Sequence, residues 1–186
     1  MPKTALIIID LQNDYFPRGK WVLDGVDTAA RNAARLLDAA RKNGDLVVHI
    51  YHENVEENAP FFVPGTDGAK INKAVLPLGQ EHVVLKHFPN SFRETGLKGI
   101  LDQAGATKLT IVGAMAQVCV DATTRAAADF GYQVTVISDA VAARSLEFDG
   151  VEVPSKYVKA SFLGGLAFAY ADVITTEEFL GRSIKD

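Results

Sequence analysis

Cys119 is the residue of this sequence best suited to nucleophilic chemistry. It is the only cysteine in the chain, and it lies between an apolar, strand-like run at 109–113 and an alanine-rich, helix-like stretch at 121–130. A thiol at the start of a helix faces unpaired backbone N–H groups and the positive end of the helix dipole, which favour the reactive thiolate. Position alone leaves a second interpretation open, an inert cysteine buried in the core, because free cysteine is among the most buried residue types.

Two charged residues end other strand-like runs. Asp10 closes the apolar run 5–10, and Lys86 closes the β-branched run 82–86. Each charge alone has an ordinary explanation, since strands often end in a polar residue as the chain leaves the core. Together with Cys119, however, they occupy the carboxyl ends of predicted parallel strands, where open α/β sheets bind their ligands. The three residues are therefore our candidates for a catalytic site.

The elements that must position these residues alternate between strands and helices along the chain, which is typical of a parallel sheet covered on both faces. We predict a three-layer αβα, Rossmann-like fold with a mostly parallel sheet of about six strands, in a single domain over residues 1–186. The predicted strands are 4–10, 45–51, 82–86, 108–113, 133–138 and 172–175. The predicted helices are 28–42, with Asp27 as N-cap and Gly44 as the stop, 93–104, 120–130, 155–167 and 176–181.

Three motifs resemble those of a known family, the isochorismatase-like cysteine hydrolases, which include isochorismatases, nicotinamidases, N-carbamoylsarcosine amidohydrolases and ureidoacrylate amidohydrolases. The motifs are IIIDLQND at 7–14, VLKHFPNSF at 84–92 and GAMAQVCVDATTRAA at 113–127. The resemblance implies that Asp10, Lys86 and Cys119 form a catalytic triad. It also implies a non-proline cis peptide between Ala114 and Met115.

The chemistry that this resemblance implies is hydrolysis of a small amide or carbamoyl compound. Asp10 would accept the proton of Cys119, Lys86 would stabilise the thiolate, and the thiolate would attack the carbonyl carbon. Backbone N–H groups of Met115 and Cys119 would form the oxyanion hole. No cofactor is needed. Two alternatives stay open: vinyl-ether hydrolysis of the isochorismatase type, which needs no thiol nucleophile, and a catalytically silent binding or scaffold module on the same fold.

Two long irregular stretches, 12–26 and 53–80, follow strand ends and are expected to wall a substrate pocket. They and the segment after Lys86 hold the aromatic residues that could shape it: Tyr15, Phe16, Trp21, Phe61, Phe62, Phe88 and Phe92. Those closest to the triad motifs are Phe16, Trp21 and Phe92. We predict that substrate is bound by Gln12, Phe16, Trp21, His52 and Phe92.

No metal site is expected. Nicotinamidases of the family hold a divalent ion with an Asp-x-His pair after the second strand, and the corresponding stretch here, 48–57, has no such pair. The adjacent residues His52 and Glu53 point to opposite faces of an extended chain and cannot easily share one ion. We instead expect His49 to pack or hydrogen-bond within its strand, His52 to line the pocket or face solvent, and His82 to face solvent.

Composition limits the other partners. The net charge is −4 with both signs interleaved, so we expect neither nucleic-acid nor membrane binding. A lone cysteine and the absence of a signal-like segment before the first strand favour a cytoplasmic location. The apolar stretch 160–170 carries more hydrophobic surface than one helix on a sheet needs, which predicts a homo-oligomer, a dimer or tetramer.

Overall fold

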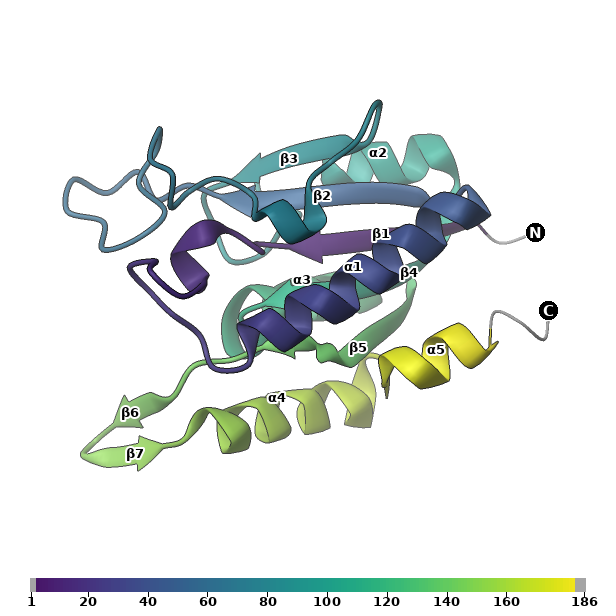
Figure 1. Ribbon diagram of the computed structural model, residues 1–186. Helices are drawn as coiled ribbons and strands as arrows, with labels where there is room; N and C mark the ends of the chain where they lie inside the picture. Colours follow the sequence, from purple (N-terminus) through teal and green to yellow (C-terminus); the bar gives the residue numbers. More distant parts are fainter. Residues whose placement is uncertain (1–2, 183–186) are drawn as a thin grey trace.

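Six parallel strands form the centre of the molecule in the computed structural model, which describes residues 3–182 (Figure 1). They are β1 (Lys3–Ile9), β2 (Leu46–His52), β3 (His82–Lys86), β4 (Ala106–Ala114), β5 (Gln133–Ala142) and β8 (Asp172–Ile174). Their order across the sheet is β3-β2-β1-β4-β5-β8, and every neighbouring pair runs parallel. The central strands β1 and β4 are almost entirely buried because helices cover both faces, which explains their unbroken apolar sequences. The predicted α/β fold is confirmed.

Helices make the two outer layers. One core cluster lies between the sheet and α1 (Val26–Asn43), with α5 (Thr176–Arg182) packed against it, and Figure 1 shows α1 crossing the front of the sheet. The other cluster joins the opposite face to α2 (Leu97–Ala104), α3 (Asp121–Asp129) and α4 (Ser155–Ala169). None of the helices in residues 3–182 is long and apolar enough to cross a membrane.

Local sequence explains where α1 begins and ends. Its buried residues recur at helical spacing, as at Ala29, Ala33, Leu37 and Ala40. It ends at Gly44, whose left-handed backbone (φ 71°) allows its N–H to reach the last carbonyls, as predicted. Its beginning differs from the prediction: Gly25 takes the N-cap position and Asp27 lies in the first turn, where its charge suits the helix dipole.

Two other elements differ from the sequence prediction. Helix α2 begins at Leu97 rather than at 93, because Glu94 has a left-handed backbone (φ 56°) that no helix can include. Strands β6 (Leu146–Phe148) and β7 (Val151–Val153) form an antiparallel hairpin that was not predicted. Its turn, Asp149-Gly150, has positive φ at both residues and is a strong hairpin signal in the sequence.

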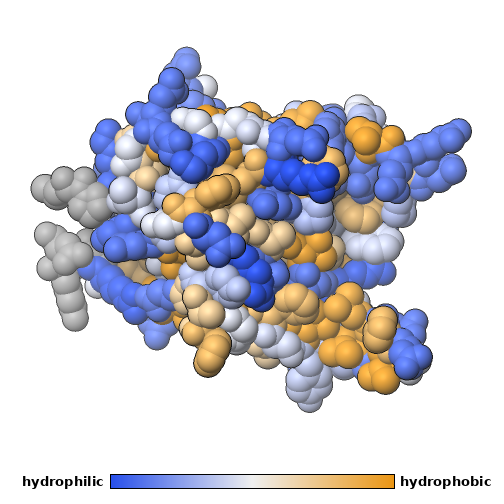
Figure 2. All heavy atoms as spheres, turned by 180° about the vertical axis from the view of Figure 1, so that it is seen from behind, coloured by the Kyte–Doolittle hydropathy of each residue, from blue (hydrophilic) through white to orange (hydrophobic). Residues whose placement is uncertain are grey.

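This hairpin and α4 carry exposed apolar side chains. Phe148 is 83% exposed and Phe168 is 92% exposed, and Val151 and Tyr157 are more than half exposed. Figure 2 shows hydrophobic residues gathered at the end of the molecule that holds the hairpin, at the lower right. Exposed apolar area of this kind is common at protein–protein contacts.

We predict that these side chains pack against a second copy of the chain. Light scattering at micromolar concentration should give at least a dimer mass, and the double variant Phe148→Glu/Phe168→Glu should give a monomer, because charges at the contact would lose their hydration. Leu78→Glu, at an apolar residue that is 59% exposed and lies in the segment before β3, is the control and should keep the wild-type mass. A monomer mass for the wild-type protein would contradict the prediction.

Candidate active site

The sheet brings Asp10 and Cys119 together at the point where the strand order reverses. The chain builds β1, β2 and β3 in one direction and then returns to place β4 on the other side of β1. Asp10 directly follows β1, and Cys119 lies in the turn after β4, so both stand at the crevice between these two strands. Open α/β sheets bind ligands at such a crevice. Lys86, at the end of β3, pairs in register with His52 at the end of β2.

The ammonium group of Lys86 joins the three predicted catalytic residues. Its Nζ lies 2.7 Å from Oδ2 of Asp10, and it donates to Sγ of Cys119 at 3.3 Å. A third contact, 2.9 Å, runs to Nδ1 of His52. The carboxylate and the sulfur lie within 4.8 Å of each other. All four side chains are buried, Asp10 and Lys86 almost completely.

The backbone around the crevice is adapted to this close approach. Asp10 has a left-handed conformation (φ 50°), which aspartate and asparagine tolerate better than most residues. In β4, Gly113 (φ 126°) faces β1 so closely that a β-carbon would overlap the carbonyl oxygen of Ile9. Glycine is therefore required there. The next peptide bond, Ala114–Met115, is cis, at the position that the resemblance implied.

Cys119 lies in a π-helical turn, Ala116–Val120, which leads directly into α3, so helical structure begins earlier than the predicted start at 120. Both Val118 and Val120 donate their N–H groups to the carbonyl of Met115. Burial raises the pKa of the Cys119 thiol, the negative charge of Asp10 raises that pKa further, and Lys86 lowers it only in part. These effects together raise the thiol pKa and favour the neutral thiol beside the Asp10–Lys86 ion pair, whereas the position near a helix start favours the thiolate.

The charge of Lys86 is stabilised by its partners. Burial alone would lower the pKa of Lys86, but the carboxylate of Asp10 and then the sulfur of Cys119 raise it, and the net pKa lies above its ordinary value. Oδ1 of Asp10 is buried without a hydrogen-bond partner among residues 3–182. Such an oxygen is free to accept a proton from a neighbour.

A pocket of about 370 Å³ opens above the sulfur of Cys119. Its walls come mainly from the loop after β2 and the segment after β3. The loop after β2 was predicted to wall the pocket. The lining residues are Tyr15, His52, Asn54, Glu56, Phe61, Phe62, His87, Phe88, Pro89, Met115, Val118 and Cys119. Asn54, Glu56 and His87 were not predicted to bind substrate, and their nearness in sequence to His52 and Lys86 was the available signal.

Only His52 among the five predicted substrate-binding residues lines this pocket. Gln12 is fully buried, and its amide group bonds to the backbone of His52 and Ala69. It therefore positions the loop and has no remaining amide hydrogen directed at the pocket.

The structure corrects the placement of the three predicted aromatic residues. Phe16 borders a separate, larger cleft of about 850 Å³ beside the segment 66–76. Trp21 stacks on Phe61, with 4.7 Å between the ring centroids, and does not belong to the pocket lining. Phe92 packs against Phe130 and Tyr132. Nearness in sequence to the motifs was therefore a poor guide to which aromatic residues line the pocket.

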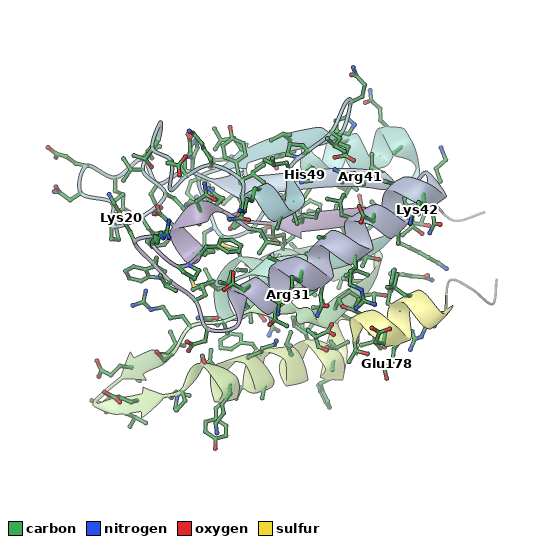
Figure 3. The ribbon with its side chains drawn as sticks, viewed as in Figure 1. Lys20, Arg31, Arg41, Lys42, His49 and Glu178 are labelled. Carbon is green, nitrogen blue, oxygen red and sulfur yellow. The ribbon has the colours of Figure 1, made fainter. Side chains whose placement is uncertain are left out.

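The histidines do not form a metal cluster with one another in the described chain. His49 is buried and bonds through Nε2 to Glu81, to which Arg41 also bonds; Figure 3 labels His49 and Arg41, which lie near each other. The Arg41 guanidinium lowers the pKa of Glu81 to about 2. His82 is exposed, as expected, and His87 bonds through Nδ1 to the carbonyl of Glu53.

One group of residues has the donor atoms that a metal ion would need. Asp10, His52 and Cys119 offer an oxygen, a nitrogen and a sulfur within 4.8 Å of one another. The same three groups converge on Nζ of Lys86 at 2.7, 2.9 and 3.3 Å. The ammonium thus already provides the positive charge at their centre, and this donor set does not fit a metal ion beside it.

The motifs and the fold agree with the comparisons with known proteins. The family model described as the Isochorismatase domain matches residues 4–177. The chain belongs to the isochorismatase family. YddQ of Bacillus subtilis, a protein of this family, is 44% identical over 95% of this chain and 98% of its own length. A structure from Oleispira antarctica described as an isochorismatase hydrolase is 49% identical, with a TM-score of 0.93 over 96% of each chain. Streptothricin hydrolase of Streptomyces noursei is 36% identical over 73% of this chain and 48% of its own length.

The opposing effects of Asp10 and Lys86 on this isochorismatase-family site predict the behaviour of a variant. In Asp10→Asn the left-handed backbone is retained, the carboxylate charge is lost, and Lys86 keeps its contact with sulfur. The pKa of Cys119 should therefore fall, and the rate of iodoacetamide alkylation at pH 8 should rise by about tenfold for each unit of pKa. Asp38→Asn, the same change at an exposed position of α1, is the control. Slower or unchanged alkylation in Asp10→Asn would contradict the assigned electrostatics.

Proposed function

We propose that this protein hydrolyses a C–N amide or carbamoyl bond of a small molecule through an acyl-enzyme on Cys119. One observation carries the proposal: a lone thiol at the floor of a pocket contacts a buried lysine, and the lysine in turn contacts a carboxylate with a free oxygen. A thiol nucleophile, a base that accepts its proton and a cation that stabilises the resulting negative charge are together suited to nucleophilic acyl transfer.

The first half of the reaction forms the acyl-enzyme. Because the thiol is neutral at rest, Asp10 takes its proton as the sulfur attacks the carbonyl carbon. A C–S bond forms, and the carbonyl electron pair moves to oxygen, where the N–H groups of Met115 and Cys119 are our candidates for the oxyanion hole. The electron pair then returns, the C–N bond breaks, and Asp10 gives its proton to the departing nitrogen.

The second half restores the enzyme. Asp10 removes a proton from water as the water oxygen attacks the thioester carbon. The C–S bond breaks, the acid product leaves, and the sulfur regains its proton from Asp10. Throughout, Lys86 keeps one positive charge beside the negative charge that moves between carboxylate and sulfur. This cycle needs no cofactor.

Support for a thiol-dependent reaction over vinyl-ether hydrolysis comes from the same contacts. An acid-catalysed reaction would need only protonated Asp10, and nothing in it would require a lysine that donates to sulfur. The family itself contains hydrolases, so the coarser assignment, a hydrolase fold with an intact site, does not depend on the choice of bond.

We predict that Cys119→Ala folds but loses amide turnover, because a methyl group cannot attack a carbonyl while alanine fits a buried turn. A screen of primary amides and ureido compounds should show a fall of at least about a thousandfold in kcat. Rapid-quench mass spectrometry of the wild-type protein should show the acyl group on Cys119, and the variant should show none. A thermal melt close to that of the wild type serves as the folding control. Turnover retained in Cys119→Ala would reject the covalent mechanism and would favour a reaction that needs no thiol, such as vinyl-ether hydrolysis.

A further inference from the structure

The pocket above Cys119 is aromatic, and its lining within residues 3–182 includes two histidines, His52 and His87, but no lysine or arginine. Four of its rings come from Tyr15, Phe61, Phe62 and Phe88, and no lysine or arginine belongs to its lining in the described chain. Lys86 does not belong to the lining, and its ammonium group already contacts Asp10, His52 and Cys119. The one carboxylate on the wall is that of Glu56, which is exposed at the rim.

A negatively charged substrate group would therefore lose its hydration here without gaining a lysine or arginine partner. Burying an unpaired carboxylate is costly, and the faces of aromatic rings carry partial negative charge that repels it. Flat or apolar carbon skeletons gain from the same surface. We propose that the substrate is an amide whose remaining part is flat or apolar and bears no negative charge. This inference rests on the proposed function for the bond that is cleaved.

Matched pairs of amides that differ by one carboxylate test this proposal. Benzamide is compared with 4-carbamoylbenzoate, and butanamide with succinamate, by kcat/KM in the wild-type protein. Binding of the same compounds to Cys119→Ala is measured by calorimetry and does not depend on turnover. We expect the carboxylate member of each pair to be worse by at least about tenfold in both measurements, equivalent to about 1.4 kcal/mol. Equal or better binding of the carboxylate members would overturn the proposal.

Charge reversal at the rim gives a second, independent readout. Glu56→Lys should reduce the difference in kcat/KM and in affinity within each pair several-fold, because the lysine supplies a cation for the substrate carboxylate. Glu57→Lys changes the net charge equally at an exposed neighbour that does not line the pocket. It should leave the difference in kcat/KM and in affinity within each pair unchanged. If uncharged compounds bind better but none is hydrolysed, the proposed function fails while the inference about charge stands.

A separate observation concerns His52. Its Nδ1 accepts the third hydrogen of the Lys86 ammonium, so the other ring nitrogen, Nε2, must carry the proton. Nε2 lies 3.0 Å from Oδ1 of Asn54, to which it donates. Asn54 is fixed in turn because its Nδ2 donates to the carbonyl of Phe61 at 3.0 Å. The hydrogen bonds thus select one tautomer.

The backbone of His52 is held as firmly as its ring. Gln12 donates from Nε2 to the carbonyl of His52 at 2.8 Å, and the N–H of His52 donates to Oε1 of Gln12, also at 2.8 Å. A second bond from Nε2 of Gln12 reaches the carbonyl of Ala69 at 2.7 Å. Both ends of His52 are therefore fixed before substrate arrives.

We infer that neutral His52 is a positioning residue: it accepts one hydrogen of Lys86 and so directs the other two at Asp10 and Cys119. A protonated imidazole could not accept that hydrogen and would place two cations 2.9 Å apart. Activity should therefore fall as the pH drops through the pKa of His52.

The surroundings of His52 set the pH at which activity falls. Burial lowers the pKa of His52, and Lys86 lowers it further, while Asp10 and Asn54 raise it and His87 lowers it slightly. Tyr15, Glu56 and Cys119 are the other titratable groups on the pocket wall. The net pKa lies below its ordinary value, so the imidazole is neutral at neutral pH.

Nitrogen-15 NMR of the imidazoles tests the state of the ring without any substrate. The chain has only four histidines, and the signal missing from His52→Asn assigns His52. We expect the Nε2–H tautomer and a pKa lower than that of a free histidine. An Nδ1–H tautomer, or a charged ring at pH 7, would overturn the inference.

Kinetics test the role of the ring. His52→Leu should lower kcat by at least about tenfold, with a smaller change in KM, because leucine cannot accept the hydrogen bond that orients the Lys86 ammonium. Asn54→Asp places a carboxylate beside Nε2, so it should raise the pKa of His52 and move the acid limb of the kcat profile to higher pH by the shift that NMR records. Asn58→Asp, the same change at an exposed position of the same loop, should move neither. An acid limb that stays in place while the NMR pKa moves would reject the positioning role.

Discussion

The site depends on one buried cation. The ammonium of Lys86 lies between a carboxylate, an imidazole nitrogen and a sulfur at 2.7, 2.9 and 3.3 Å. Removing either member of a buried ion pair leaves an uncompensated charge and typically costs about 3–5 kcal/mol. Because Lys86 and its three acceptors come from β2 and β3 and from the positions after β1 and β4, these four strands must be in place before the ammonium is satisfied. Fold and chemistry are therefore linked at this atom.

Burial decides the resting state of the thiol. The sequence placed Cys119 near a helix start and beside a cation, and both features lower a thiol pKa; the structure adds nearly complete burial and an adjacent carboxylate, and these outweigh them. The site is thus distinct from one that stores a thiolate. In the proposed reaction, a proton acceptor and a nucleophile would change state together, with the total charge near Lys86 almost constant during the transfer.

Periodicity and strand-end chemistry were sufficient to predict the sheet and the three residues at its edge, because both follow from local rules. Asp10 and Lys86 end short apolar runs. In a parallel sheet the carboxyl ends of such strands lie at the same edge, so the fold class brings these residues together. The pocket wall was predicted poorly for a physical reason: Phe16 and Phe61 both belong to long loops, and hydrogen bonds between distant segments, such as that of Phe62 N–H to Asp14, decide which ring faces the sulfur. No local pattern encodes that choice.

The proposed catalytic side chains and the pocket wall come from different parts of the fold. Strand ends and the turns after them, with Gly113 permitting the close approach of β4 to β1, hold Asp10, Lys86 and Cys119. Loops hold most of the rings and the one carboxylate of the pocket wall. His52 belongs to both, since it ends β2, contacts Lys86 and lines the pocket. A change of loop sequence can therefore alter the pocket wall without disturbing the ammonium, provided that the acceptor at position 52 is kept.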